Sequence, residues 1–199
     1  MKGARSLDRI LNFMVSANRL KEVKRSGWLI SRVPNPEHVG DHSYSTAMLS
    51  YLLARKKGLD ADRCLVLALV HDLNEAITGD IATRYDKRKQ KVQPKQKKML
   101  ERKNELRMAS LLGPYGSGHI RKLLDELNEN KTEEARLVKQ ADKLDWIIQI
   151  VAYSKYMKSD DRVEEFFLVA DPQIDVPEIR YIYDKVRKKI YSERRMEKK

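Results

Sequence analysis

The longest uninterrupted apolar stretch of the chain is residues 64–70 (CLVLALV), and it ends directly at His71 and Asp72. Seven apolar residues are far too few to cross a bilayer, so the stretch predicts a helix buried in a protein core. A buried carboxylate without a partner is energetically expensive. Something must compensate the two polar side chains, and a metal ion is the leading candidate.

The rest of the sequence predicts an all-helical fold. A chain of 199 residues is most simply one domain and is long enough to bury a core. Helical spacing, capping residues, glycines and prolines divide it. We expect helices over residues 5–22, from about Asp41 to Lys57, from Asp60 or Asp62 up to the TGD turn at 78–80, over 94–112, 119–130 and 132–157, and from Pro177, the last after a connector at 170–177.

The chain is strongly basic, with 41 Lys and Arg against 29 Asp and Glu and a formal net charge of +12. This balance favours anionic or phosphorylated partners. Much of the charge lies in residues 84–103 and 185–199, each of which is either a solvated helix face, a frayed tail or a surface for nucleic acid. Aromatic residues are sparse in both stretches, which disfavours stacking on bases. We expect the lysines at 87–98 to act by long-range attraction.

No membrane or export signal is evident. Asp8, Asn12 and Asn18 interrupt the apolar residues near the N-terminus, so a signal-type apolar core is absent there. We therefore expect a soluble, cytoplasmic protein that has no membrane partner.

Three of the predicted helices carry a polar anomaly on an apolar background. His42 begins one of them, His71 and Asp72 follow the apolar run, and Asp142 lies in LVKQADKLDWIIQIV. Two imidazoles and two carboxylates suit Mn, Co, Fe, Ni or Zn better than calcium, and Mg remains possible. We predict that these four residues bind one divalent ion. Four protein ligands leave two positions of an octahedral coordination shell, which suffice for a water and one substrate oxygen.

Two further carboxylates follow the His-Asp pair. Glu75 comes four residues after His71 and three after Asp72, so we expect it to share their helix face. That position suits a general acid or base beside the metal. Asp80 follows the glycine that ends the helix and can reach the same cavity. The alternatives are a surface carboxylate for Glu75 and a turn residue for Asp80.

These motifs resemble a known family. The pattern H…HD…D, with HDLNEAITGD, QADKLDWIIQ and KRSGWLISRVPNPEHVGDHS around it, is similar to the HD-domain metal-dependent phosphohydrolases. Within them it resembles the branch of the bacterial 5′-deoxynucleotidases and the oxetanocin-like proteins. The resemblance extends from about Leu20 to about Tyr153. We divide the chain into an HD domain at 1–185, with its core motifs at 20–155, and a basic C-terminal tail at 186–199.

The resemblance implies roles for individual residues. It supports the four metal ligands, gives proton transfer to Glu75, and places Asp80 against the sugar or the attacking water. In this branch an arginine directly before the tryptophan holds the nucleotide phosphate. Here Gly27 precedes Trp28, and the nearest basic residue is Arg25. We expect Arg25 to bind phosphate and Trp28 either to stack on the sugar and base or to pack in the core. The resemblance also implies a homodimer.

The sequence therefore predicts an enzyme that releases phosphate from nucleoside 5′-monophosphates, most simply deoxyribonucleotides. No Walker-type phosphate loop is present, which argues against a triphosphate motor or a kinase. Two alternatives stay open at this point. One is another HD-type hydrolase that acts on triphosphate, cyclic or alarmone nucleotides. The other is a nucleic-acid-binding protein in which the metal is only structural.

Overall fold

Helices make up the regular secondary structure of residues 2–196, the part of the chain that this computed structural model describes. The α-helices are α1 (Lys2–Ala17), α2 (Ser26–Ile30), α3 (Val39–Lys57), α4 (Ala61–Val70), α5 (Glu75–Thr78), α6 (Pro94–Ser110), α7 (Ser117–Glu129), α8 (Glu133–Tyr153), α9 (Asp160–Ala170) and α10 (Pro177–Met196). Within this range the structure has no β-strand, and a single isolated bridge joins Lys24 and His38. The all-α prediction is confirmed. None of the described helices combines the length and the apolarity that crossing a membrane requires.

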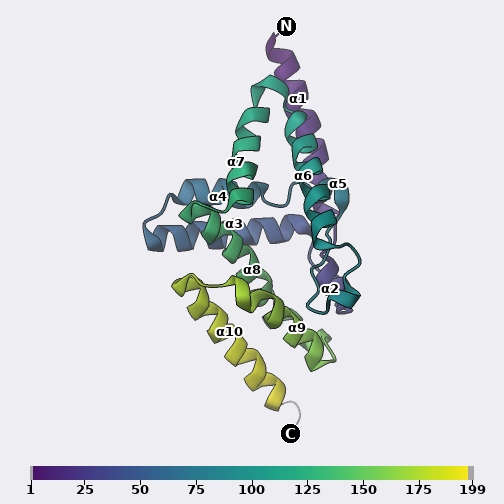
Figure 1. Cartoon of the computed structure of the whole chain (residues 1–199), viewed down its shortest axis with the longest axis vertical. Helices are drawn as coiled ribbons and strands as arrows, with labels where there is room; N and C mark the ends of the chain where they lie inside the picture. The colour runs from purple at the N-terminus through teal and green to yellow at the C-terminus, as the bar shows by residue number, and fades with distance from the viewer. Residues whose placement is uncertain (1, 197–199) are drawn as a thin grey trace.

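Helices α3, α4 and α8 form the centre of the molecule (Figure 1). Gly58 ends α3 with a φ of 72°, a value that glycine adopts without strain, and the chain reverses. The Asp60 side chain then accepts a hydrogen bond from the backbone N–H of Arg63, which starts α4. The apolar run predicted as a buried helix is therefore α4, and its Leu67 is fully buried.

The helices α1, α6 and α7 extend to one end of the long axis, and α9 and α10 lie toward the other (Figure 1). Pro94 begins α6, and Asn130, with a φ of 52°, ends α7. Inside the α6–α7 pair, the Asn128 side-chain amide donates to Glu105 over 2.8 Å. Helix α7 contacts α4 and α8, so the α6–α7 pair lies beside the central helices. Residues of both helices form one wall of a cavity there.

Helix α9 was not expected from the sequence, which placed no helix between 157 and 170. Ser159 caps its start, and two of its own residues, Val163 and Phe167, are buried. The Phe167 ring meets Tyr183 of α10 edge to face, with centroids 5.7 Å apart. Apart from Val163, the apolar residues of α9 cluster in its second half, over 166–170, so they show little helical period along the sequence.

The predicted helix from residue 60 to the TGD turn is wrong in its second half, because α4 stops at Val70. The backbone N–H groups of Leu73 and Glu75 bond to the carbonyl oxygens of Val70 and Asp72, over 3.3 and 2.9 Å, which makes a tight turn before α5. His71 and Asp72 thus lie at a helix end and not in mid-helix.

At the other end of the chain, α10 begins at Pro177 as expected and continues through the basic segment to Met196. Ile190 is buried within that segment. The boundary predicted between the HD domain and the tail, at residues 185 and 186, therefore falls inside α10. Residues 197–199 of the predicted tail lie outside the described residues.

Candidate metal centre and its cavity

His71 is oriented by its own helix. Its Nδ1 lies 2.6 Å from the carbonyl oxygen of Ala68, one turn earlier on α4. A carbonyl oxygen only accepts, so a neutral His71 carries its proton on Nδ1 and presents the lone pair of Nε2. Asp72 lies beside it, with Oδ2 at 3.1 Å from that Nε2.

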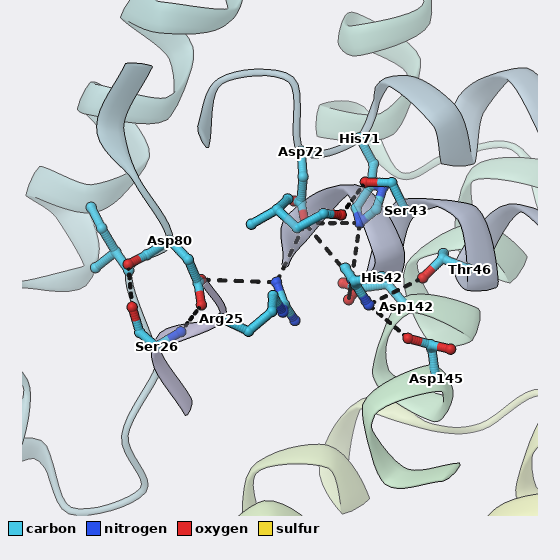
Figure 2. Close-up of polar contacts among 12 residues, drawn as sticks. Arg25, Ser26, His42, Ser43, Thr46, His71, Asp72, Asp80, Asp142 and Asp145 are labelled. Atoms are coloured by element: carbon cyan, nitrogen blue, oxygen red, sulfur yellow. Dashed lines mark hydrogen bonds and ion pairs between the residues drawn. The ribbon is translucent and has the colours of Figure 1, made fainter. Parts of the chain in front are cut away.

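His42 reaches the same point from the first turns of α3. It is fully buried, and its Nε2 lies 3.4 Å from Nε2 of His71. The same nitrogen is 3.2 Å from Oδ1 of Asp142 on α8 and 3.7 Å from Oδ2 of Asp72. Figure 2 shows the four side chains converging from three segments of the chain. The structure thus brings together all four residues that the sequence selected as ligands.

This donor set fits a divalent metal ion. One atom from each of His42, His71 and Asp72 lies within 4.8 Å of the others, and Asp142 adds a carboxylate beside His42. Two imidazole nitrogens and two carboxylates bring their lone pairs to one point, where they repel one another. A cation between them satisfies all four groups, and the mixture of nitrogen and oxygen donors is typical of first-row transition metals.

The charges around the ligands favour ionised carboxylates. Burial alone would raise the pKa of Asp142, but Lys143 at 2.7 Å and then His42 hold that pKa well below its usual range. Burial and Arg25 lower the pKa of His42, but Asp142 and Asp145 raise it to about 9. The same carboxylates that raise this pKa would favour a metal cation beside His42.

Glu75 lies next to this cluster and is buried, with 8% of its surface exposed. Its Oε2 has no hydrogen-bond partner among residues 2–196. Burial, and then the nearby Asp72 and Asp80, raise the pKa of Glu75 well above its ordinary value. A buried carboxyl group with a raised pKa and a free oxygen is suited to proton transfer.

Arg25 and Asp80 form a second, adjoining cluster. Arg25 Nη1 lies 3.5 Å from Oδ2 of Asp72 and 3.8 Å from Oδ1 of Asp80. The Ser26 hydroxyl donates to the carbonyl oxygen of Asp80 over 2.6 Å, and the Ser26 N–H donates to its carboxylate. Arg25 therefore connects the α2 segment to the metal ligands, while Asp80 is already engaged by that segment.

Trp28 is almost completely buried, with 1% exposed. Its ring stacks on Phe166 with centroids 4.5 Å apart, and its Nε1 donates to Glu37 over 2.8 Å. Of the two interpretations of Trp28, this position favours packing in the cavity wall over stacking on a base.

A cavity of about 350 Å³ opens beside these clusters. Arg25, His71, Asp72, Glu75, Asp80 and Asp142 all line it. Sequence reasoning missed several other lining residues, among them Lys97, Lys139, Lys143 and Trp146. Four lining residues of α8 recur at helical spacing, namely Lys139, Asp142, Lys143 and Trp146. The sequence therefore did contain a signal for this face of the helix.

Among the lysines at 87–98, which we expected to act by long-range attraction, Lys97 lies at the cavity. Its ammonium donates to the carbonyl oxygen of Ile81 over 2.7 Å, and the residue lines the cavity. The start of α6 lies near this cavity because the segment 81–93 folds back, with Gln90 bonded to the Arg84 N–H and to the Ala82 carbonyl.

Comparison with known proteins decides the family. The family model described as HD domain matches residues 17–180, a span that contains every ligand candidate. The chain belongs to the HD domain family. This confirms the resemblance that the motifs indicated.

Among curated relatives, the chain is 34% identical to the 5′-deoxynucleotidase HDDC2 of Xenopus laevis, over 85% of this chain and 82% of that one. It is 33% identical to the Homo sapiens 5′-deoxynucleotidase HDDC2, over 89% and 82% of the two chains. A solved structure, a conserved hypothetical protein from Pyrococcus furiosus, is 32% identical with a TM-score of 0.69, over 89% and 99% of the two chains. A protein from Magnetospirillum magnetotacticum described as a predicted metal-dependent phosphohydrolase shares the fold, with 22% identity and a TM-score of 0.69, over 94% and 91%.

Proposed function

We propose that this protein is a metal-dependent phosphohydrolase that releases phosphate from deoxyribonucleoside 5′-monophosphates. The observation that carries the proposal is the convergence of two imidazoles and two carboxylates on one point at the side of a cavity. The 30–34% identity to several proteins named 5′-deoxynucleotidase, over most of both chains, supports the choice of substrate.

One divalent ion would be held by His42, His71, Asp72 and Asp142. Mn, Co, Ni, Fe and Zn suit these donors, and Mg is a weaker candidate. When bound, such an ion supplies a Lewis acid for a phosphoryl oxygen and lowers the pKa of water toward neutrality.

The protein's own groups then divide the remaining work. Arg25 lies beside Asp72 and offers a planar guanidinium, which suits the charge and the geometry of a phosphate group. Glu75 moves a proton at its free Oε2, either from water or to the leaving oxygen. Asp80 keeps Arg25 and Ser26 in place where the sugar of the substrate would lie. Trp28 forms part of the cavity wall at that place.

The cavity size supports a single nucleotide as the substrate. About 350 Å³ lies at the lower end of the range for small-molecule pockets, which is roughly 300–1,000 Å³. A site of this size fits one mononucleotide better than a strand of nucleic acid. Free nucleotides are abundant in the cytoplasm, and we propose that the enzyme works there.

We also propose that two copies associate. Helices α3 and α4 pack side by side and together expose Tyr44, Met48 and Leu52 of α3 and Val66 and Leu69 of α4. The exposed fractions of these residues range from 38% to 66%, and we call this set the α3–α4 apolar face. A second copy of the chain is the partner that we propose for this face.

The proposal is tested by measuring phosphate release from a panel of ribo- and deoxyribonucleotides. Mn, Co, Ni, Zn and Mg are supplied in turn. We expect 5′-deoxyribonucleoside monophosphates to be hydrolysed fastest and only with a metal. Hydrolysis of triphosphates or cyclic nucleotides in preference to every monophosphate would contradict the proposed substrate.

A further inference from the structure

A buried carboxylate lies behind His42, on the side of the ring that faces away from the other ligands. Oδ2 of Asp145 is 2.7 Å from His42 Nδ1, whereas Asp142 approaches Nε2. Asp142 and Asp145 are three residues apart on α8, so one turn of this helix contacts both nitrogens of one imidazole (Figure 2). Asp145 is 8% exposed and His42 is fully buried, so bulk water competes little for this contact.

The other polar groups near Nδ1 of His42 compete little with Asp145 for this nitrogen. Glu37 is the other carboxylate near Nδ1 of His42, but its Oε1 accepts the Trp28 N–H over 2.8 Å. The Thr46 hydroxyl is 3.4 Å from Nδ1, considerably farther than Asp145. Asp145 is therefore the dominant partner of this nitrogen.

An imidazole binds a metal through the nitrogen that lacks a proton, and the partner of the other nitrogen selects the tautomer. We propose that Asp145 is a positioning residue, which holds the proton of His42 on Nδ1 and thereby directs Nε2 at the metal. This inference rests on the metal set proposed above.

The two histidines are thus oriented by different acceptors. His71 donates to a backbone carbonyl, whereas His42 donates to an acidic side chain. A carboxylate acceptor also raises the basicity of the coordinating nitrogen, and loss of such a partner typically weakens metal affinity about 10- to 100-fold. Asp145 therefore adjusts how tightly the site holds its ion, without touching the ion.

The first test is the dissociation constant for Mn and Zn, measured by competition with a chelating dye, in the wild type and in Asp145→Asn. We expect affinity to fall about 10- to 100-fold in the variant. Asp184→Asn is the matched control, because Asp184 is exposed on α10, a helix that contributes no residue to the metal cluster or to the cavity. Its affinity should equal that of the wild type.

A second measurement needs no variant. Nitrogen-15 NMR of the zinc-loaded wild type should show His42 with its proton on Nδ1 and the metal on Nε2. Zinc on Nδ1 of His42 would overturn the inference, as would wild-type affinity in Asp145→Asn. Asp142→Ala separates the two proposals. Normal metal content in both variants contradicts the metal set itself, and loss of metal in Asp142→Ala alone contradicts only the role of Asp145.

Discussion

Glu75 shows at the residue scale how surroundings create a reactive group. Its raised pKa follows from burial first and then from Asp72 and Asp80, and its Oε2 is free of protein partners within residues 2–196. We expect Glu75→Gln to keep its metal and to lose about 100- to 10,000-fold in kcat, because proton transfer is removed while size is conserved. Single-turnover rates together with elemental analysis check this, and near-normal turnover would remove Glu75 from the mechanism.

Arg25 is the second residue with a separable role. Arg25→Ala removes a charge-assisted contact, typically worth about 1.5–3 kcal/mol, so kcat/KM should fall roughly 10- to 100-fold, mainly through KM. Arg88→Ala is the control, because Arg88 is exposed and pairs only locally with Asp86. Equal effects of the two substitutions on KM would show that net charge, and not a specific phosphate contact, is responsible.

The sequence predicted the residues of this site better than their surroundings. His42, His71, Asp72 and Asp142 were recognisable because polar groups on apolar helices demand compensation. Asp145 escaped notice because the partner of a ligand has no spacing rule of its own. The burial of Trp28 depends on Phe166, from a helix that the sequence did not reveal.

At the scale of elements, one ion pair attaches the basic loop after Asp80 to α9. Arg84 makes two hydrogen bonds to Glu165, of 2.8 and 2.9 Å. Burial tends to raise the pKa of Glu165, but Arg84 outweighs it and lowers the pKa below the ordinary value of 4.5. A lowered pKa in the folded state means that the pair stabilises the protein above pH 4.5 and loses this contribution as the pH falls through the folded value.

Glu165→Gln should therefore destabilise the protein at neutral pH, and the difference from the wild type should shrink as the pH falls below about 4.5. Urea unfolding midpoints measured between pH 3 and 7 check this expectation. A difference that is independent of pH would mean that the carboxylate charge of Glu165 contributes nothing to stability.

Elements were predictable where local signals agreed. Gly58 and Asp60 fixed the α3–α4 reversal because backbone freedom and capping both act within a few residues. The end of α4 at Val70 was not predicted, since no glycine or proline follows it before Gly79. The turn at His71 and Asp72 is stabilised by the groups that gather there from α3 and α8, a tertiary effect.

The whole molecule presents the α3–α4 apolar face defined above, and a second copy is its proposed partner. Replacing Leu52 and Val66 by lysine should shift the protein to monomers, because two positively charged faces cannot associate without burying unpaired charge. Met99→Lys is the control, since Met99 is 66% exposed on α6, away from this face. Light scattering after size exclusion measures the mass. A dimer that survives the double substitution but not the control would place the interface elsewhere.

The central claim joins metal binding to phosphate release, and one experiment tests both. Protein stripped with a chelator is titrated with Mn or Co while phosphate release from a deoxyribonucleoside 5′-monophosphate is followed, for the wild type and for Asp72→Ala. We predict that wild-type activity is absent without metal and saturates at one ion per chain, and that Asp72→Ala stays inactive throughout. Full activity in the stripped wild type, or restored activity in Asp72→Ala, would contradict the account.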